Sequence, residues 1–221
     1  QLAHVLLNQA HGDDGLGEAL DRCLLALPTA VALRERMELA SEAVSPSLPA
    51  DRSARLMLVN ATGAALLTGL VSELARLGAD ALVVDGSREA LAFVDAGLPS
   101  RPSSVRLKLV QQDLGELVLG LRPEGFGTQD VVVLDSLIDY LPDRLVASLL
   151  AWARGHLAEG GVAILTGLAP SPDAGLFDHL LRWPMVRRSG RELAGLVEAA
   201  GLRPQRWRGA GRAGRGTTSM V

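Results

Sequence analysis

Aromatic residues are scarce in this chain, and cysteine and lysine each occur only once. Phenylalanine, tryptophan and tyrosine make up 3% of the 221 residues, so a core must be built mainly from leucine, valine and alanine. Cys23 has no possible partner within the chain, which excludes an internal disulfide. Because aromatic side chains that could stack on bases are few, the composition argues against a nucleic-acid-binding protein.

Several motifs that indicate particular chemistries are also missing. No cysteines and histidines have the spacing of metal ligands, and there is no Gly-Lys-Thr/Ser loop for nucleoside triphosphates. No serine lies in a Gly-x-Ser-x-Gly context, which argues against a hydrolase with that nucleophile. Neither a signal-peptide pattern nor an apolar run long enough to cross a bilayer is present, so we expect a cytoplasmic protein. The chain begins with Gln1 rather than methionine, as a segment of a longer polypeptide with an upstream domain would.

Positive charge is concentrated toward the end of the chain, although the formal net charge is −3. Residues 182–221 contain nine arginines and two glutamates, so the remainder of the chain is acidic. One interpretation is a solvated surface in a protein that uses arginine instead of lysine, since Lys108 is the only lysine. The alternative is a surface that attracts an anionic substrate or an acyl carrier.

The first 50 residues have a helical pattern. Residues 16–27 and 29–44 carry apolar side chains at helical spacing with charges between them, and Pro28, Pro46 and Pro49 interrupt the pattern. We therefore predict a helical N-terminal extension over residues 1–50, followed by one domain over residues 51–221.

Beyond residue 51, short apolar runs alternate with helical segments. The predicted strands are 55–59, 81–85, 105–110, 130–135 and 161–166, and the predicted helices are 64–77, 87–96, 142–157 and 189–200. Continuous apolar runs are typical of strands that are covered on both faces. The alternation predicts an α/β fold with a mostly parallel sheet. Two strand-like runs around the Gly-rich 209–216 further predict a terminal hairpin that adds an antiparallel edge strand.

In a parallel sheet of this kind, ligands bind beyond the carboxyl ends of the strands. Asp85 ends the second predicted strand, where a carboxylate can accept hydrogen bonds from ribose hydroxyls. It can equally be an acid at the start of the next helix, which Ser87 would cap. Asp113 and Leu114 follow the third strand, where they could bind an adenine or simply belong to a loop.

Further polar residues follow the fourth predicted strand and occur near residue 180. Asp135, Asp139 and Tyr140 leave the fourth strand and are candidates for binding or catalysis, although Asp139 could also be a helix-start charge. His179 and Trp183 are four residues apart, which predicts one shared helix face. His179 could then act as a general base, or it could be an ordinary surface histidine.

The order of these motifs resembles that of a class I S-adenosylmethionine-dependent methyltransferase. The first strand and Gly-rich turn of that family match LMLVNATG at 56–63, and its Asp-x-Ser-x-Glu-x-Leu pattern matches residues 85–91. Its adenine position matches QQDL at 111–114, its fourth strand matches residues 130–141, and its Leu-x-Pro-Gly-Gly turn matches LAEGG at 157–161 with Glu159 in place of proline. The resemblance implies a Rossmann-like seven-stranded methyltransferase sheet.

Two further stretches, LIDYLPDRLVASLL at 137–150 and LLRWPMVRRSGRELAGL at 180–196, resemble a bacterial subgroup that forms methyl esters of 3-hydroxy fatty acids. This resemblance implies that S-adenosylmethionine is the cofactor and that Arg188 pairs with a substrate carboxylate. It implies cofactor contacts for the matching positions Asn60, Gly63, Asp85, Ser87, Asp113, Leu114 and Asp135, a substrate contact for Trp183, and a catalytic role for His179, Tyr140 or Asp139.

The turn after the first strand departs from the family pattern, because its Gly-x-Gly falls on Asn60-Ala61-Thr62. Asparagine tolerates left-handed backbone, whereas a β-branched threonine does not, and Gly63 could take over part of the glycine role. Side chains at 60 and 62 would narrow the cofactor space. Two functions therefore stay open: an O-methyltransferase acting on a carboxylate or hydroxyl of a small acyl or lipid-like substrate, or a pseudo-methyltransferase that serves as a binding or structural module of a larger protein.

Overall fold

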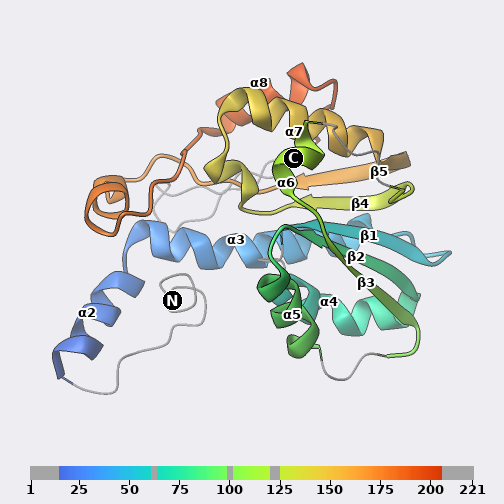
Figure 1. Cartoon of the computed structure of the whole chain (residues 1–221), viewed down its shortest axis with the longest axis horizontal. Helices are drawn as coiled ribbons and strands as arrows, with labels where there is room; N and C mark the ends of the chain where they lie inside the picture. Colours follow the sequence, from blue (N-terminus) through green and yellow to red (C-terminus); the bar gives the residue numbers. More distant parts are fainter. Residues whose placement is uncertain (1–14, 61–63, 99–101, 120–124, 206–221) are drawn as a thin grey trace.

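A computed structural model describes residues 15–60, 64–98, 102–119 and 125–205. Its centre is a five-stranded sheet in the order β3-β2-β1-β4-β5, in which every neighbouring pair is parallel (Figure 1). The strands are β1 Ala54–Val59, β2 Ala79–Asp85, β3 Val105–Gln111, β4 Gln129–Leu134 and β5 Leu157–Leu165. The α/β class, the parallel sheet and all five predicted strands are therefore confirmed.

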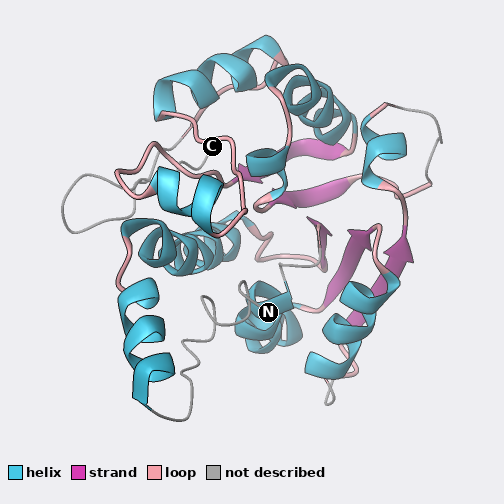
Figure 2. Ribbon diagram, turned by 60° about the vertical axis from the view of Figure 1, so that its left-hand side comes forward, coloured by secondary structure: helices cyan, strands magenta, loops and turns pink. Residues whose placement is uncertain are grey.

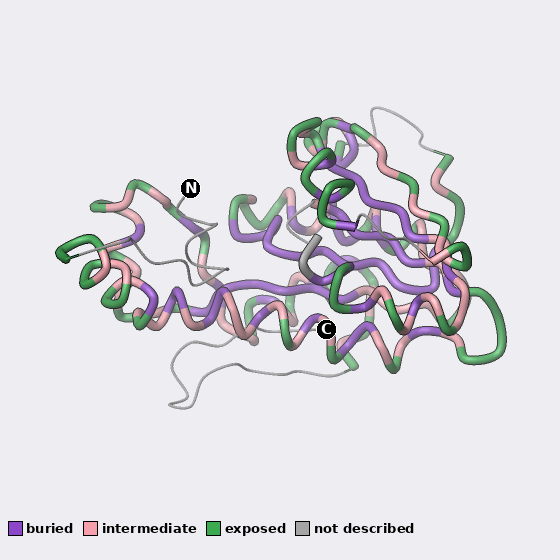
Figure 3. Tube along the Cα trace, turned by 90° about the horizontal axis from the view of Figure 1, so that it is seen from below, coloured by how far each residue is buried: buried purple, intermediate pink, exposed green. Residues whose placement is uncertain are grey.

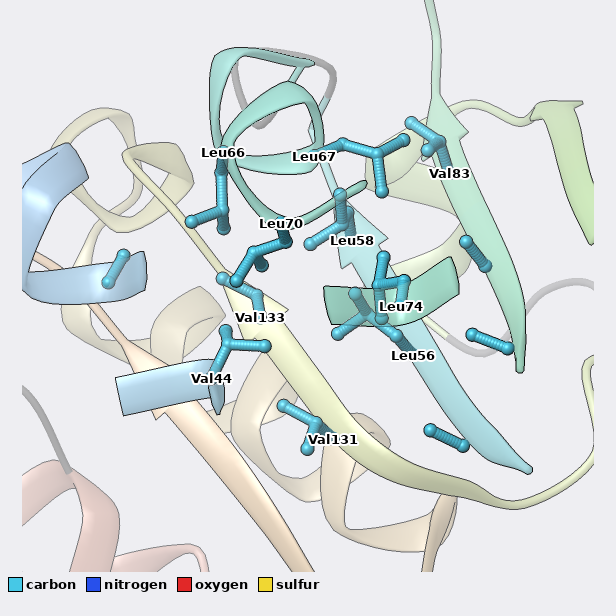
Figure 4. Packing of buried hydrophobic residues seen from close by; sticks show 14 of the residues in the cluster. Val44, Leu56, Leu58, Leu66, Leu67, Leu70, Leu74, Val83, Val131 and Val133 are labelled. Atoms are coloured by element: carbon cyan, nitrogen blue, oxygen red, sulfur yellow. The ribbon is translucent and has the colours of Figure 1, made fainter. Parts of the chain in front are cut away.

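Helices cover both faces of this sheet (Figure 2). Alternate residues of β1 point to opposite faces, so Leu56 and Leu58 belong to one core cluster and Met57 and Val59 to another. The first cluster is completed by α3 Pro28–Val44, α4 Ala64–Leu77 and α5 Arg88–Gly97, and the second by α6 Leu114–Val118, α7 Asp143–Gly155 and α8 Gly190–Ala199. Figure 4 shows Leu66, Leu70 and Leu74 of α4 packed over β1 and β4.

The central strands β2, β1 and β4 are buried along most of their length, while the helices alternate between buried and exposed sides (Figure 3). β4 is buried at all six positions, which explains why its sequence is continuously apolar after Asp130. β3 lies at the edge of the sheet, and its burial alternates. Within the described ranges, no helix is both long and apolar enough to cross a membrane.

The N-terminal helices are α2 Gly15–Leu25 and α3. Residues from both helices pack with Leu168, Phe177 and Met185 into a third apolar cluster. The second half of α3 reaches the sheet, because Ala40 and Val44 belong to the first core cluster. The helical extension thus contacts the sheet domain at two places, and its boundary at residue 50 stays a prediction.

Three expectations differ from the structure. The described residues form five parallel strands rather than seven, and they do not support the antiparallel terminal strand, because residues 206–221 lie outside the described part. The short helix α6 was not predicted. The turn expected before the fifth strand is instead a bulge inside β5, where Gly160 has φ 73° and the register with β4 shifts.

Candidate functional site

The chain reverses its direction across the sheet between β1 and β4. The connections run from β1 outward to β2 and β3, then return to β4 and continue to β5 on the other side. A crevice for ligands forms beyond the carboxyl ends of the strands at such a switch point. The residues that follow β1 and β4 there are Asn60 and Asp135.

Asn60 occupies left-handed backbone, with φ 82°, and its N–H donates to the carbonyl oxygen of Val84 over 2.9 Å. Its side-chain Nδ2 lies 3.5 Å from the carbonyl oxygen of Asp135 and 3.4 Å from Oγ of Ser136. Ser136 is left-handed as well, with φ 54°. The Asn60 side chain therefore spans from the end of β1 toward the end of β4. Residues 61–63, including Gly63, lie outside the described residues.

A buried ion cluster, formed by Arg36, Asp135 and Asp139, lies beside these strand ends. Arg36 of α3 lies 3.3 Å from Oδ1 of Asp135 through Nε and 2.7 Å from Oδ2 of Asp139 through Nη1. The three residues are 4%, 2% and 1% exposed. Thr166, at the end of β5, donates its hydroxyl to Asp135 and accepts the N–H of Ser136 over 3.2 Å. The backbone N–H of Leu168 donates to Asp139 over 3.0 Å.

Two carboxylates share one guanidinium in this cluster, so it holds a net negative charge when all three groups are ionised. Burial alone would lower the pKa of Arg36, but Asp135 and Asp139 outweigh burial and raise it, so the guanidinium stays charged. Burial raises the pKa of Asp139, while Arg36 and the N–H of Leu168 act against that rise. A net negative charge beside the switch point favours a cationic ligand group over a neutral or anionic one.

Asp85 is 7% exposed at the end of β2, and its Oδ1 accepts the N–H of Ser87 over 2.7 Å. Ser87 in turn caps α5, because its Oγ accepts the N–H of Ala90 over 3.1 Å. The predicted capping role of Ser87 is confirmed. Asp85 stands beside β1 at the carboxyl edge of the sheet, as ribose binding requires.

Asp113 caps α6, since its Oδ1 accepts the N–H of Glu116 over 2.9 Å. The interpretation of Asp113 as a local structural acid therefore has direct geometric support, while adenine binding stays a prediction. Leu114, the next residue, lines a small apolar cavity of about 80 Å³ together with Leu137 and Leu141. This cavity lies between α6, the 3-10 helix η3 Leu137–Tyr140 and α7.

Tyr140 and Trp183 form a pair at the surface beside the ion cluster. Trp183 Nε1 donates to the Tyr140 hydroxyl over 2.8 Å, and the Trp183 ring lies 6.2 Å from that of Phe177. Burial raises the pKa of the Tyr140 phenol, although the residue is still 47% exposed. Tyr140 follows Asp139 directly in the chain, so the Tyr140–Trp183 pair lies next to the ion cluster.

The prediction that His179 and Trp183 share one helix face is wrong. The helical turn η4 covers Leu176–Leu180, and Trp183 follows it outside any helix, after Arg182, which has φ 50°. His179 is exposed, whereas Phe177, two residues earlier, is buried. The geometry agrees with a surface histidine, and among the described residues no contact supports a catalytic role for His179.

The guanidinium of Arg188 is engaged in hydrogen bonds within the protein. Its Nε donates to Asp143 over 2.9 Å, Nη1 donates to the carbonyl oxygen of Ile138 over 2.7 Å, and Nη2 donates to that of Leu141 over 2.6 Å. The residue is 4% exposed. Arg188 therefore holds the segment after η4 against η3. Because Nε, Nη1 and Nη2 all donate to protein groups, few N–H groups remain to bind a substrate carboxylate.

Sequence reasoning missed Arg36 and gave Thr166 no role in a site. Thr166 had a weak signal, because it is the last residue of the predicted strand 161–166. Arg36 had a stronger one, since it lies three residues from Leu33 and four from Ala40 on the buried stripe of α3. A charged residue inside an apolar stripe indicates a buried partner, but the sequence does not say which residue that partner is.

The chain is similar in fold, but not in sequence, to proteins of known structure. No family model matches the chain, and no curated protein matches its sequence. The crystal structure of a possible exported protein from Bordetella parapertussis has a TM-score of 0.73 at 22% identity, covering 98% of this chain and 76% of that one. An O-methyltransferase family 2 protein from Planctomyces limnophilus, in complex with apigenin, has a TM-score of 0.58 at 16% identity, covering 93% and 68%. LepI in complex with S-adenosylmethionine has a TM-score of 0.57 at 13% identity, and this chain covers 45% of its length. The fold is that of S-adenosylmethionine-dependent methyltransferases.

Proposed function

We propose that this chain is an S-adenosylmethionine-dependent methyltransferase that acts on an oxygen, carboxylate or hydroxyl, of a small acyl or lipid-like substrate. The observation that carries the proposal is the convergence of Asn60, Asp85 and Asp135 at the carboxyl ends of β1, β2 and β4, on either side of the switch point. The likeness in fold to methyltransferases, which this chain shares at low identity, supports the same conclusion. A cytoplasmic location and the presence of an upstream domain stay predictions.

The residues present fit this cofactor in part. Asp85 would accept from the ribose hydroxyls, and Leu114 would pack beside the adenine, with Asp113 near its amino group. With both carboxylates ionised, the Arg36–Asp135–Asp139 cluster would have a net negative charge and suit a sulfonium, which is positively charged. The side chain of Asn60 reaches across the space at the end of β1, where a glycine would leave room. We therefore expect weak binding of the isolated chain.

S-adenosylmethionine supplies a methyl group that is already activated by the sulfonium. The residues of this chain then have to orient the acceptor oxygen and exclude water. A hydroxyl acceptor must lose a proton, whereas a carboxylate acceptor needs no general base. Asp139 is engaged by Arg36 and Leu168, and His179 is exposed, so the described residues favour a carboxylate acceptor. Tyr140 is a poor base as well, because burial raises the pKa of its phenol and the phenol therefore keeps its proton near neutral pH.

Calorimetric titration with S-adenosylmethionine and S-adenosylhomocysteine tests the proposal. The Asp85→Ala variant should bind both about 1–3 kcal/mol more weakly than the wild type, as expected for the loss of hydrogen bonds to a charged group. Asp51→Ala is the matched control, because Asp51 is an exposed carboxylate at the opposite end of β1. Equal affinities of the wild type and Asp85→Ala, with both folded, would contradict the proposed site.

The second candidate function is a pseudo-methyltransferase that keeps the fold as a binding or structural module. The observation that favours it is the Asn60 side chain, which lies against the end of β4. This reading predicts no detectable affinity for either cofactor form, even when glycine replaces Asn60 and Thr62. Measurable binding by the wild type or by the glycine variant would favour the enzyme instead.

A further inference from the structure

A larger cavity lies at the opposite end of the sheet from the candidate site. Its volume is about 390 Å³, and it is lined by the amino ends of β1, β2 and β3 and by the segment that leads into β4. Because the strands are parallel, one strand length separates this cavity from Asn60, Asp85 and Asp135 at the carboxyl ends. Pockets for small organic ligands have volumes of about 300–1,000 Å³, so this cavity can hold such a ligand.

Charged side chains from neighbouring strands form a row across the cavity. Asp80 lies in register with Arg55 of β1 and with Arg106 of β3, and alternation along the strands places all three on the face of the second core cluster. Arg106 donates to both carboxylate oxygens of Asp80 through Nε and Nη2. Arg55 donates through Nη1 to the hydroxyl of Thr128 over 3.0 Å, and its Nη2 lies 3.5 Å from Asp130. The carboxylates of this row are therefore already occupied by arginines.

Lys108 adds a positive charge that no described residue neutralises. It lies opposite Leu82 in the register of β2 and β3, on the same face as Arg106, and it lines the cavity. Among the described residues, no hydrogen bond or ion pair engages its ammonium. The lining residues include three cations and one carboxylate, an excess of two positive charges. The neighbouring pair of Arg52 and Asp130, joined by two hydrogen bonds, leaves this excess unchanged.

Phe126 gives the cavity an aromatic surface. Its ring lies 6.3 Å from that of Trp152 and 5.9 Å from that of His156, and neither of those two residues lines the cavity. Gln129 is 5% exposed and donates through Nε2 to the carbonyl oxygen of Phe126 over 2.8 Å. The buried Leu82 adds apolar surface to the lining. Held in this way, an aromatic ring beside an apolar side chain suits the planar part of a ligand, because stacking on such rings is favourable for every base.

We propose that this cavity binds a phosphate monoester that carries a planar ring, the class to which nucleoside monophosphates belong. Lys108 pairs with the phosphate, because an ammonium is a compact point charge that suits phosphate oxygens. A phosphate monoester has a charge of about −1.5 to −2 at neutral pH, which matches the excess of two cations. Phe126 contacts the ring. A bare phosphate would leave most of the cavity unfilled, and a neutral ring would leave Lys108 unpaired. This site is separate from the cofactor site, so the inference goes beyond the proposed function and does not rest on it.

Uridine 5′-monophosphate, uridine and ribose 5-phosphate, titrated into the full chain, separate the contributions of charge and ring. We expect the nucleotide to bind about tenfold more tightly than uridine, because its phosphate forms charged hydrogen bonds. It should also bind more tightly than ribose 5-phosphate, which has no base to stack. Lys108→Gln should remove the first preference and Phe126→Leu the second. Arg76→Gln is the matched control, since Arg76 is an exposed arginine of α4, which packs on the other face of the sheet.

Lys108 can also be observed directly, because it is the only lysine of the chain. Dimethylation with ¹³C-labelled methyl groups gives one lysine resonance and keeps the positive charge. Uridine 5′-monophosphate should shift this resonance, whereas uridine and S-adenosylhomocysteine should not.

Three results would overturn the proposal. The first is equal affinity for the nucleotide and for uridine, and the second is undiminished nucleotide binding by Lys108→Gln, an exposed substitution that leaves the core intact. The third is competition between the nucleotide and S-adenosylhomocysteine, because the nucleotide would then occupy the cofactor site. Failure of S-adenosylhomocysteine to bind would contradict the proposed methyltransferase and leave nucleotide binding unaffected.

Discussion

Thr29 and Asp173 are 144 residues apart in the sequence, yet Asp173 caps the first turn of α3. One oxygen of its carboxylate accepts the N–H of Thr29 over 2.9 Å, and the other accepts the Thr29 hydroxyl over 2.8 Å. No side chain next to α3 in the sequence caps it, because the N-cap position is Leu27. A carboxylate from the segment after β5 thus satisfies the N-terminus of a helix that precedes β1 and complements its dipole.

Replacing Asp173 should weaken the attachment of α3. We expect Asp173→Ala to lower the free energy of unfolding by about 1 kcal/mol, as is typical for the loss of a helix cap. Urea denaturation followed by circular dichroism measures the change, with Asp51→Ala as the exposed control. An unchanged midpoint would show that water replaces the carboxylate without loss.

The same cap predicts a dependence of stability on pH. Burial acts to raise the pKa of Asp173, but hydrogen bonds from Ser171 and Thr29 outweigh it and lower the pKa below its ordinary value of 3.8. The stabilisation from a depressed pKa is complete above the unfolded value and is lost as the pH falls through the folded one. The difference in stability between the wild type and Asp173→Ala should therefore be constant near neutral pH and shrink below about pH 4. A difference that grows on acidification would contradict this assignment.

Replacing Arg36 should destabilise the protein more than replacing any exposed arginine. Arg36→Met leaves Asp135 and Asp139 buried without their cation, which typically destabilises a protein by about 3–5 kcal/mol. Adding Asp135→Asn and Asp139→Asn should recover much of that loss, because the triple variant buries no charge at these positions. Thermal and urea unfolding of the single and triple variants measure the effect. Equal stability of Arg36→Met and the wild type would mean that the cluster is open to water in solution.

Substitution of Arg188 distinguishes a structural role of this residue from a role in substrate binding. Because its guanidinium bonds to Asp143 and to two backbone carbonyls, Arg188→Met should lower the free energy of unfolding by about 2–3 kcal/mol. Arg191→Met, an exposed position at the start of α8, should stay within about 0.5 kcal/mol of the wild type. A stable Arg188→Met variant that loses only substrate affinity would instead restore the role implied by the family resemblance.

Gly161 is required by the bulge in β5. A Cβ at this position would lie 2.9 Å from the carbonyl oxygens of both Ala158 and Gln129. Gly161→Ala should therefore destabilise the protein by about 1–3 kcal/mol. Gly195→Ala is the opposite control, because a Cβ there meets nothing within 4 Å in the middle of α8 and should stabilise by about 0.5–1 kcal/mol. Differential scanning calorimetry resolves both signs.

The turn after β1 can be tested by adding glycine. Asn60→Gly with Thr62→Gly should raise the affinity for S-adenosylmethionine if the Asn60 side chain obstructs the site, despite an entropic cost of about 0.5–1 kcal/mol for each glycine. Calorimetric titration compares the double variant with the wild type. Lower affinity in the variant would mean that these side chains contact the cofactor instead of excluding it.

The strands and the longer helices were predictable because their signals are local. The apolar runs of β1, β2 and β4 are continuous, and α4 was predicted at its observed bounds, Ala64–Leu77. The five-residue α6 is too short to show a period, and its cap, Asp113, was predicted only as an adenine-binding or loop residue. The error at Trp183 had a local cause as well, since Pro184 disfavours helical backbone at the residue before it.

The candidate site was less predictable because its contacts join distant segments. Asp85, Asp135 and Asp139 were predicted as site residues because they lie at or just after strand ends, where parallel α/β sheets bind ligands. Their burial and partners were not, because Arg36 and Asp139 are separated by 103 residues.

The long reach of α3 has a consequence for how the chain is made. Its partners are Asp135, Asp139, Leu168 and Asp173, so a ribosome completes residues 28–44 well before it synthesises the segments that will bury them. The Leu33 end of the helix, which packs with Leu168, Phe177 and Met185, is therefore exposed while the intervening hundred or so residues emerge. Docking of α3 becomes a late, non-local step. Such steps slow folding and prolong the exposure of apolar surface that promotes aggregation. Nascent chains stalled before β5 should accordingly engage chaperones through this helix, and those extended past Asp173 should release them.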